Sequence, residues 1–154
     1  MLKRFTFDDV RYAAKECERQ RSGEMSVYHM LNALETMRQQ KKPWYKQPSD
    51  DGFIAFVVAL AKYVNNNAGL SVRDVPVTVN GNVLKVTGEA LWDSLRRFLE
   101  NSNYMTPVEF YKEFEQIHPF IDGNGRVGSI LYNWLNGTLD NPIAPPDVFG
   151  EESC

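Results

Sequence analysis

Apolar residues recur at intervals of three and four positions along most of this chain, which is the spacing that places them on one face of an α-helix. The predicted helix over residues 52–66 is apolar on nearly all sides, so we expect it to be the buried centre of the fold. The expected fold class is therefore mainly α. The predicted helices cover residues 6–21, 26–41, 52–66, 88–100, 107–118 and 125–136.

The fifth predicted helix has clear boundary signals at both ends. Thr106 and Glu109 have the spacing of a capping box, in which each side chain bonds the backbone N–H of the other residue. Pro107 stands at the first helical position, where its missing N–H is not needed. Pro119 disfavours helical geometry at the residue before it, so the helix should end at His118.

Residues 75–87 change to a period of two, which is typical of a β-strand with one buried face. Asn80-Gly81 lies between the two alternating runs and is the strongest short signal for a hairpin turn. An isolated hairpin is only marginally stable in water, so we expect its apolar face to lie against the helices. A two-residue turn predicts the pairs Val79–Asn82, Val77–Leu84 and Val75–Val86.

The residues most suited to chemistry are concentrated in one string, since residues 118–126 read His-Pro-Phe-Ile-Asp-Gly-Asn-Gly-Arg. His118 can move a proton near neutral pH, because its unperturbed pKa is about 6.5. Asp122 can bind a hard cation such as Mg²⁺, which prefers oxygen ligands. Gly123-Asn124-Gly125 allows backbone N–H groups to converge on an anion, and Arg126 begins a helix whose dipole points to the same place. A base, a metal ligand and a phosphate-binding loop indicate phosphoryl or nucleotidyl transfer.

Composition and charge narrow the class of protein. The chain has 154 residues, 43% hydrophobic and 24% charged, which suits a single globular domain. A net charge of −3 argues against nucleic acid or an anionic membrane as the main partner. Residues 53–61 are apolar but far shorter than the roughly 20 residues needed to span a bilayer. The two cysteines do not suggest a disulfide framework and the N-terminus lacks the apolar core of a signal peptide. We therefore expect a cytoplasmic protein, or one that is delivered into a host cell.

The chain is expected to form one domain over residues 1–138. The remaining residues, 139–154, contain three prolines and several acids, which predict an extended or partly disordered tail.

The string at 118–126 resembles the signature of the Fic family, His-x-Phe-x-(Asp/Glu)-Gly-Asn-Gly-Arg-x-x-Arg, and matches it completely over these positions. The resemblance implies a compact helical bundle with a β-hairpin flap before the motif, and an enzyme that transfers AMP from ATP to a protein hydroxyl. It implies that His118 is the catalytic base and that Asp122 binds Mg²⁺. The nucleotide-binding residues that it implies are Gly123, Asn124, Gly125, Arg126 and Asn133, the last from a position where such proteins often carry Asn.

The same resemblance implies the partners. In this family the flap holds a segment of the target protein by strand addition, in which backbone pairing aligns a hydroxyl and leaves the side chains free to vary. The expected target is a protein with a Ser, Thr or Tyr hydroxyl, and the expected co-substrate is ATP or another nucleoside triphosphate with Mg²⁺. The target-docking flap residues that this implies are Val77, Thr78, Val79, Asn80 and Gly81.

The chain departs from the motif at its last position, where Ser129 replaces the arginine that is understood to hold the terminal phosphate. Three alternatives follow: the γ-phosphate is held loosely or by Arg96, Arg97 or Lys85; the donor is another nucleotide or a nucleotide-linked metabolite; or the transfer activity is lost. The inhibitory Ser/Thr-x-x-x-Glu-Gly/Asn pattern of the family also has no match here, so any restraint would come from a separate antitoxin-like partner.

Three functions therefore remain open. The first is a protein adenylyltransferase, or another nucleotidyltransferase that acts on protein. The second is a Doc-like phosphotransferase, which binds the nucleotide reversed and passes on the γ-phosphate, although the motifs of such toxins depart from the Gly-Asn-Gly kept here. The third is a catalytically impaired module that binds a partner protein through its hairpin.

Overall fold

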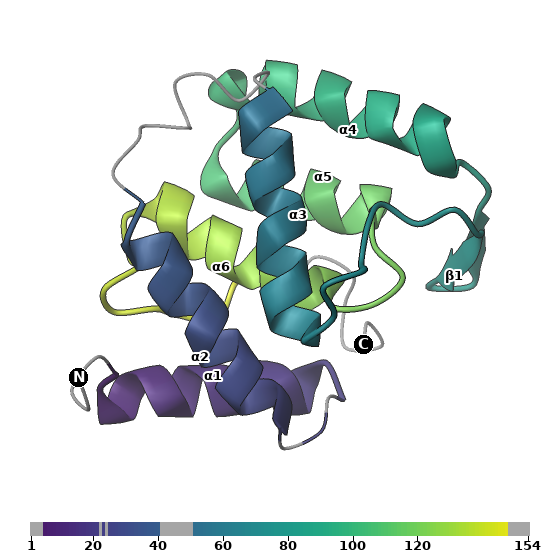
Figure 1. The fold of residues 1–154 in the computed structure, drawn as a ribbon. Coiled ribbons are helices and arrows are strands. Elements are labelled where there is room, and N and C mark those ends of the chain that lie inside the picture. Colours follow the sequence, from purple (N-terminus) through teal and green to yellow (C-terminus); the bar gives the residue numbers. More distant parts are fainter. Residues whose placement is uncertain (1–4, 22, 24, 41–50, 148–154) are drawn as a thin grey trace.

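The computed structural model describes residues 5–147 except residues 22, 24 and 41–50, and this part of the chain is mainly helical (Figure 1). Within it, two short strands form an antiparallel hairpin. The predicted fold class, a helical fold with one hairpin, is confirmed. The elements in chain order are α1 (Phe7–Arg19), α2 (Met25–Arg38), α3 (Asp51–Asn65), β1 (Val77–Val79), β2 (Asn82–Leu84), α4 (Gly88–Asn101), the 3₁₀ helix η2 (Ser102–Tyr104), α5 (Pro107–Ile117) and α6 (Asn124–Asn136).

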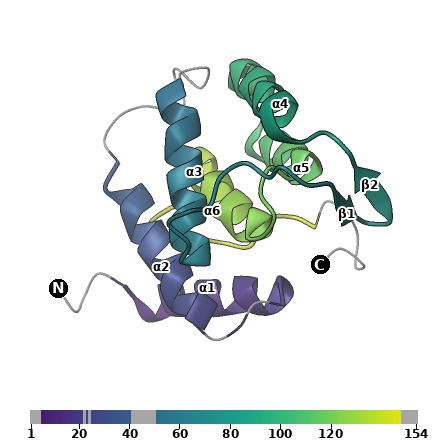
Figure 2. The same ribbon diagram turned by 45° about the vertical axis from the view of Figure 1, so that its right-hand side comes forward.

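Helix α6 is the buried centre of the fold. It packs against α1, α2, α3 and α5 (Figure 2), and every residue over 124–133 is buried. The expectation that the third helix would be the centre is wrong, because α3 buries one face and leaves Tyr63 on its other face 50% exposed. The hydrophobic pattern could not show this, since polar side chains on α6 are buried with partners from other elements. These side chains are Asn124, Arg126, Ser129 and Asn133.

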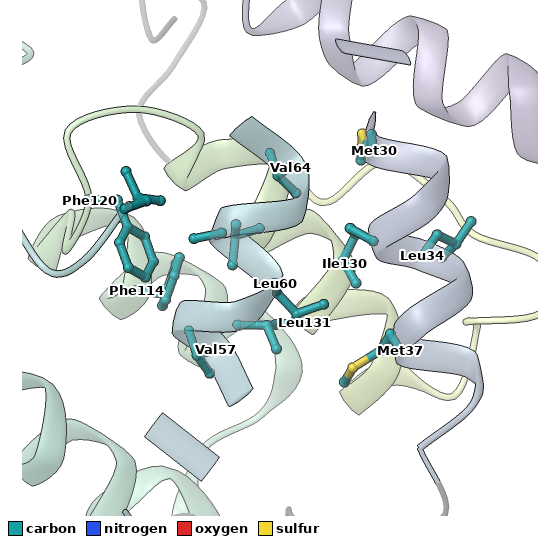
Figure 3. Packing of buried hydrophobic residues seen from close by; sticks show 14 of the residues in the cluster. Met30, Leu34, Met37, Val57, Leu60, Val64, Phe114, Phe120, Ile130 and Leu131 are labelled. Atoms are coloured by element: carbon teal, nitrogen blue, oxygen red, sulfur yellow. The ribbon is translucent and has the colours of Figure 1, made fainter. Parts of the chain in front are cut away.

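The hydrophobic core joins α2, α3, α5 and α6 (Figure 3). Phe120, from the loop that precedes α6, lies in the same cluster and is fully buried. Burying a large apolar side chain contributes about 1.5–3 kcal/mol, so this packing fixes both α6 and the loop before it. The side chains labelled in Figure 3 are Met30, Leu34, Met37, Val57, Leu60, Val64, Phe114, Phe120, Ile130 and Leu131.

The capping box predicted for the fifth helix is present. The Thr106 hydroxyl accepts a hydrogen bond from the Glu109 N–H at 3.1 Å, and the Glu109 carboxylate accepts from the Thr106 N–H at 2.8 Å. Helix α5 begins at Pro107 and is followed by His118, as the sequence predicts. The position of His118 at a helix end is therefore a consequence of local sequence.

The hairpin has the predicted register near its turn, where Val77 lies opposite Leu84. The third predicted pair, Val75–Val86, lies outside the strands. The carbonyls of Val75 and Val86 accept hydrogen bonds from Nη1 of Arg73 instead, at 3.0 and 2.9 Å. A guanidinium inserted between the two strand ends thus replaces the expected pairing.

The hairpin projects from the edge of the helices near α4 and α5 (Figures 1 and 2). Val77, Val79 and Leu84 are half-buried, whereas Val83 is 56% exposed. The expectation that the apolar face lies against the helices is met only in part, because none of the strand residues joins the hydrophobic core. The hairpin depends on its attachment at residues 73–76 and 85–88.

The chain after α6 is extended and fixed to the helices. Gly137, with a φ of 75°, ends α6. The Asn133 side chain then bonds both the N–H and the carbonyl of Ile143 at 2.8 Å, and Arg38 donates to the Leu139 carbonyl. Residues 139–147 therefore follow the surface of the helices, whereas the remainder of the expected tail, 148–154, lies outside the described residues. Among the described helices, none has the length and apolar character needed to cross a bilayer.

Candidate active site

His118 lies at the C-terminal end of α5 in a left-handed backbone conformation, with φ 50° and ψ 63°. Such values are uncommon for residues other than glycine, so neighbouring bonds must hold them. The His118 N–H donates to the Phe114 carbonyl at 3.0 Å, and the His118 carbonyl accepts from Nε of Arg73 at 2.7 Å. The imidazole is therefore presented from a backbone that is bonded on both sides.

The surroundings of the imidazole favour its neutral form. Burial lowers the pKa of His118 below its ordinary value. The backbone of Glu115 and the carboxylate of Asp122 offset part of this effect, while the cation of Arg73 adds to it. With its pKa below 6.5, the ring is unprotonated at pH 7 and can accept a proton.

The loop after His118 is braced by the side chain of Asn124. Its Oδ1 accepts from the Phe120 N–H at 2.9 Å, and its Nδ2 donates to the Phe120 carbonyl at 2.7 Å. The Asn124 side chain is thus occupied within the loop. What this residue can offer to an anion is its backbone N–H, at the start of α6.

The N-terminus of α6 has the form of an anion cradle. Gly123, with a φ of 80°, precedes the first turn, where the N–H groups of residues 124–126 have no carbonyl partner within the helix. A Cβ at Gly123 would lie 2.6 Å from Nδ2 of Asn65, and a Cβ at Gly125 would overlap the Gln20 side chain. Gly123 is therefore required where the end of α3 approaches the loop, whereas a side chain at position 125 would require the Gln20 side chain to move.

Arg126 is buried beneath the cradle. Its Nη1 donates to the Val64 carbonyl at 3.2 Å, and its Nη2 lies 3.4 Å from Oδ1 of Asn65 and 3.6 Å from Oδ1 of Asp122. Its Nε is buried and has no hydrogen-bond partner among the described residues. The guanidinium therefore places a positive charge under the N-terminus of α6, where it adds to the helix dipole.

Asp122 stands at the mouth of the cradle with its side chain 79% exposed. Its Oδ1 accepts from the Gly123 N–H at 2.8 Å. An exposed carboxylate suits Mg²⁺, which takes one or two protein oxygens together with phosphate oxygens and water. Among the described residues, no group of three or more His, Cys, Asp or Glu side chains could hold a metal, so an ion at Asp122 would be shared with a phosphate ligand.

These groups line a single cavity of about 110 Å³. It brings together the predicted residues His118, Asp122 and 123–126, and adds Gln20 and Glu115. A larger cavity of about 550 Å³ lies between α1 and residues 141–144 and contains none of the predicted site residues. The small cavity is therefore the one, of these two, that brings the predicted site residues together.

The arrangement is that of a base, a carboxylate and a helix N-terminus around one cavity, and a family model for the Fic/DOC family matches residues 19–135. The chain belongs to the Fic/DOC family. Fic/DOC proteins are generally nucleotidyl- or phosphotransferases that use a nucleoside triphosphate with Mg²⁺, and they are often associated with protein targets and antitoxin partners. No curated protein and no solved structure matches the chain.

Ser129, at the last position of the Fic motif, does not line the cavity. It is fully buried, and its hydroxyl lies 2.6 Å from the hydroxyl of Tyr12 on α1. Tyr12 is itself buried. A long cationic side chain at position 129 would have to displace this tyrosine, so the packing of α1 against α6 is matched to serine.

None of the three cations considered as substitutes lines the cavity around His118. Arg96 pairs with Asp93 on the surface of α4 at 3.4 Å, and Arg97 is exposed on the same helix. Lys85 lines a separate cavity of about 360 Å³ beside the hairpin. Among the described residues, Arg126 is the arginine or lysine that lines this cavity.

The structure does not bring Asn133 to the cavity. Its amide bonds the Ser129 carbonyl at 2.9 Å, the Thr138 hydroxyl at 2.7 Å and the Ile143 backbone. These contacts direct the side chain toward the segment after α6. The flap residues 77–81 also lie outside the cavity. Arg73, which bonds the His118 carbonyl, bonds the carbonyls of Val75 and Val86 at the two ends of the hairpin.

Glu115 is a cavity residue that the sequence analysis missed. It lies one helical turn before His118, is 8% exposed, and its Oε1 has no hydrogen-bond partner among the described residues. Burial raises the pKa of Glu115 to about 7, with a smaller opposing effect from Arg19 and a further increase from Glu16. The sequence contained one signal for Glu115, since it places a carboxylate next to Phe114 on the apolar side of α5. Charged side chains are seldom buried, so a carboxylate at such a position indicates a special role.

Proposed function

We propose that this Fic/DOC protein is a protein adenylyltransferase, which transfers AMP from ATP to a Ser, Thr or Tyr hydroxyl of a target protein. The observation that carries the proposal is the shared cavity of His118, Asp122 and the N-terminus of α6. It supplies a base for the hydroxyl, a metal-binding carboxylate and N–H donors for phosphate. The intact Gly-Asn-Gly at 123–125 favours AMP transfer over the γ-phosphate transfer of Doc-like proteins.

In the proposed reaction, the imidazole of His118 takes the proton of the target hydroxyl. A bond forms between the hydroxyl oxygen and the α-phosphorus, and the bond from that phosphorus to the α–β bridging oxygen breaks. Pyrophosphate leaves with the electron pair of the broken bond. General-base assistance of this kind typically contributes about 10²–10⁴ in rate.

The cradle and Arg126 hold the phosphates in this proposal. Backbone N–H groups fixed at a helix N-terminus stabilise negative charge without having to reorient during the reaction. Asp122 would hold Mg²⁺, and the ion would neutralise phosphate charge that repels the incoming hydroxyl. The residues present fit such an ion, because the Asp122 carboxylate is exposed beside the cradle.

The flap of residues 77–81 is proposed to hold the target segment by strand addition. Among the described residues, no further strand pairs with the outer edge of either strand, and the hairpin projects from the helices (Figure 2). Backbone pairing would place a hydroxyl near His118 with little demand on target sequence. Any inhibitory partner is proposed to be a separate antitoxin-like protein.

Transfer from ATP labelled at either phosphate tests the proposal. The chain is incubated with Mg²⁺, a cell lysate and ATP labelled at the α- or the γ-phosphate, and protein-bound label is measured. Label from the α-phosphate supports adenylyl transfer. Label from the γ-phosphate alone supports the phosphotransferase alternative, and no label from a folded chain that still captures a partner supports the impaired module.

Two histidine variants make the test specific. His118→Ala is expected to abolish transfer, since it removes the base. His29→Ala is the matched control, because His29 lies on α2 outside the cavity. Equal activity of the two variants would contradict the assignment of His118.

A further inference from the structure

Arg73 is a buried cation, 4% exposed, in the segment between α3 and β1. Its guanidinium donates to backbone carbonyls: Nε to His118 at 2.7 Å, Nη1 to Val75 and Val86, and Nη2 to Ile117 at 3.4 Å. Among the described residues, no carboxylate pairs with it, and burial lowers the pKa of Arg73. The Arg73 side chain therefore serves to hold backbone carbonyls in place and not to neutralise a carboxylate.

The backbone of Arg73 continues the same connection. Its N–H donates to the Pro119 carbonyl at 2.9 Å, and its carbonyl accepts from the Gly88 N–H at 3.0 Å. Side chain and backbone together therefore join both ends of the hairpin to the turn that carries His118. An arginine donates from three separate nitrogens in a planar fork, whereas the three N–H groups of a lysine all leave from one nitrogen and span a smaller distance.

Two features of the structure make this connection necessary. The His118 backbone is left-handed, and its carbonyl is held by the bond from Nε of Arg73. The hairpin has two strands of three residues each and lies outside the core, so its own stability is marginal. Without the Arg73 side chain, only the two backbone bonds of residue 73 would join the hairpin ends to the turn that carries His118.

We propose that Arg73 is a positioning residue that fixes the hairpin and the His118 turn as one unit, so that a target segment paired to the hairpin presents its hydroxyl to the imidazole. The inference rests on the proposed transfer to a target hydroxyl. It assigns a role in aligning target and base, and none in binding the nucleotide.

Kinetics of Arg73→Ala and Arg73→Lys test the alignment, with Arg97→Ala as the control because Arg97 is an exposed arginine on α4. Misplacement of reacting groups by about 1 Å can cost about 10²-fold in rate. We expect Arg73→Ala to lower kcat by about this factor and to raise the KM for the target protein, with the KM for ATP unchanged. Arg73→Lys should fall between Arg73→Ala and the parent.

A second measurement does not depend on activity. The protein has two histidines, so NMR titration can follow His118 with His29 as an internal reference. The groups around His118 that affect its pKa are the Glu115 backbone, the Arg73 cation and the Asp122 carboxylate. Loss of the Arg73 cation and looser burial both raise the pKa of His118, so Arg73→Ala should shift that titration upward and leave His29 unchanged. Arg73→Lys keeps the charge and should shift it less.

The outcomes separate the two proposals. If the parent transfers no label, the proposed function fails. The connection made by Arg73 is still supported if Arg73→Ala shifts the His118 titration upward and speeds amide exchange at residues 77–84. If Arg73→Ala lowers only the unfolding temperature, with kcat, both KM values and the His118 titration unchanged, the positioning role is overturned. If Arg73→Ala does not fold, the same criteria apply to Arg73→Lys.

Discussion

The hydroxyl of Tyr12 lies 2.6 Å from the hydroxyl of Ser129, where α1 crosses the centre of α6. Both residues are buried, and Nδ2 of Asn133 approaches the same Tyr12 oxygen at 3.4 Å. At the position where the Fic motif carries its last arginine, this chain therefore has a hydroxyl that binds α1 to α6. The departure from the motif is part of the helix packing and not an isolated loss of charge.

Restoring the motif arginine by Ser129→Arg should therefore destabilise the protein. The larger side chain must displace Tyr12, and overpacking of a core position typically costs about 1–3 kcal/mol before the burial of the charge is considered. We expect a loss of this size or more in the free energy of unfolding, measured by urea denaturation. Ser71→Arg is the control, because Ser71 is exposed. If Ser129→Arg were as stable as the parent and bound ATP more tightly, the Tyr12 side chain would be able to move aside at little cost in stability, and this prediction would be wrong.

The parts of the site that could be predicted from sequence are those made by neighbouring residues. Thr106, Pro107 and Glu109 determine where α5 begins, and Pro119 determines where it ends, so the position of His118 followed from local rules. The cradle was predictable for the same reason, because consecutive residues at a helix N-terminus form it.

The parts that could not be predicted depend on contacts between distant segments. Gln20 and Asn65 approach the cradle from the ends of α1 and α3, and Arg73 reaches His118 across 45 positions. Asn133 was assigned to the nucleotide from its place in the motif, whereas its partners lie in a segment whose path the sequence pattern did not show. Periodicity identifies the buried faces of helices but not which polar groups meet between them.

Glu115 should give the stability of the protein a distinct pH dependence. Its pKa is about 7 in the folded chain, against an ordinary value of 4.5, so the folded state holds this proton more tightly than the unfolded state. Its contribution to stability is therefore full below about pH 4.5 and is lost as the pH rises through about 7. The shift corresponds to about 3 kcal/mol between those limits.

Glu115→Gln removes this titration. We expect the parent to lose about 3 kcal/mol relative to the variant between pH 5 and pH 9, measured by urea denaturation at each pH. The comparison with the variant isolates Glu115 from His118, whose lowered pKa has the opposite effect below pH 6.5. Glu113→Gln is the control on the exposed side of α5. Parallel pH curves for the parent and Glu115→Gln would mean that this carboxyl is not buried in solution.

Asp122→Asn should separate metal binding from folding. The amide oxygen can still accept from the Gly123 N–H, and the side chain is exposed, so the fold should be retained. Loss of the carboxylate should raise the Mg²⁺ concentration for half-maximal transfer by at least roughly 10-fold, since disturbing a metal site typically costs 10–100-fold. Mg²⁺ titrations of α-label transfer measure this, with Asp93→Asn on α4 as the control. An unchanged Mg²⁺ dependence would place the metal elsewhere.

The two glycines of the cradle should respond differently to alanine. Gly123 has a φ of 80°, and a left-handed conformation costs an L-residue roughly 1–2 kcal/mol. The added Cβ would also meet the Asn65 amide, whose Nδ2 is held by the carbonyls of Ala61 and Asp122 at 2.9 and 3.1 Å. Gly137→Ala is the matched control, because Gly137 has a φ of 75° but an added Cβ there would meet no other segment of the described chain within 4 Å. The extra loss of stability in Gly123→Ala over Gly137→Ala should therefore report the contact with Asn65.

Gly125 lies within the first turn of α6, where alanine is compatible with the backbone. Its added Cβ would meet the flexible end of the Gln20 side chain, which can turn aside. We expect Gly125→Ala to have nearly the stability of the parent and to bind ATP more weakly, because a methyl group then stands between the phosphates and the N–H groups. Urea denaturation and ATP titration measure the two quantities. If Gly125→Ala lost as much stability as Gly123→Ala, the Gln20 side chain would be unable to move aside. Nucleotide would then have to bind without displacing Gln20.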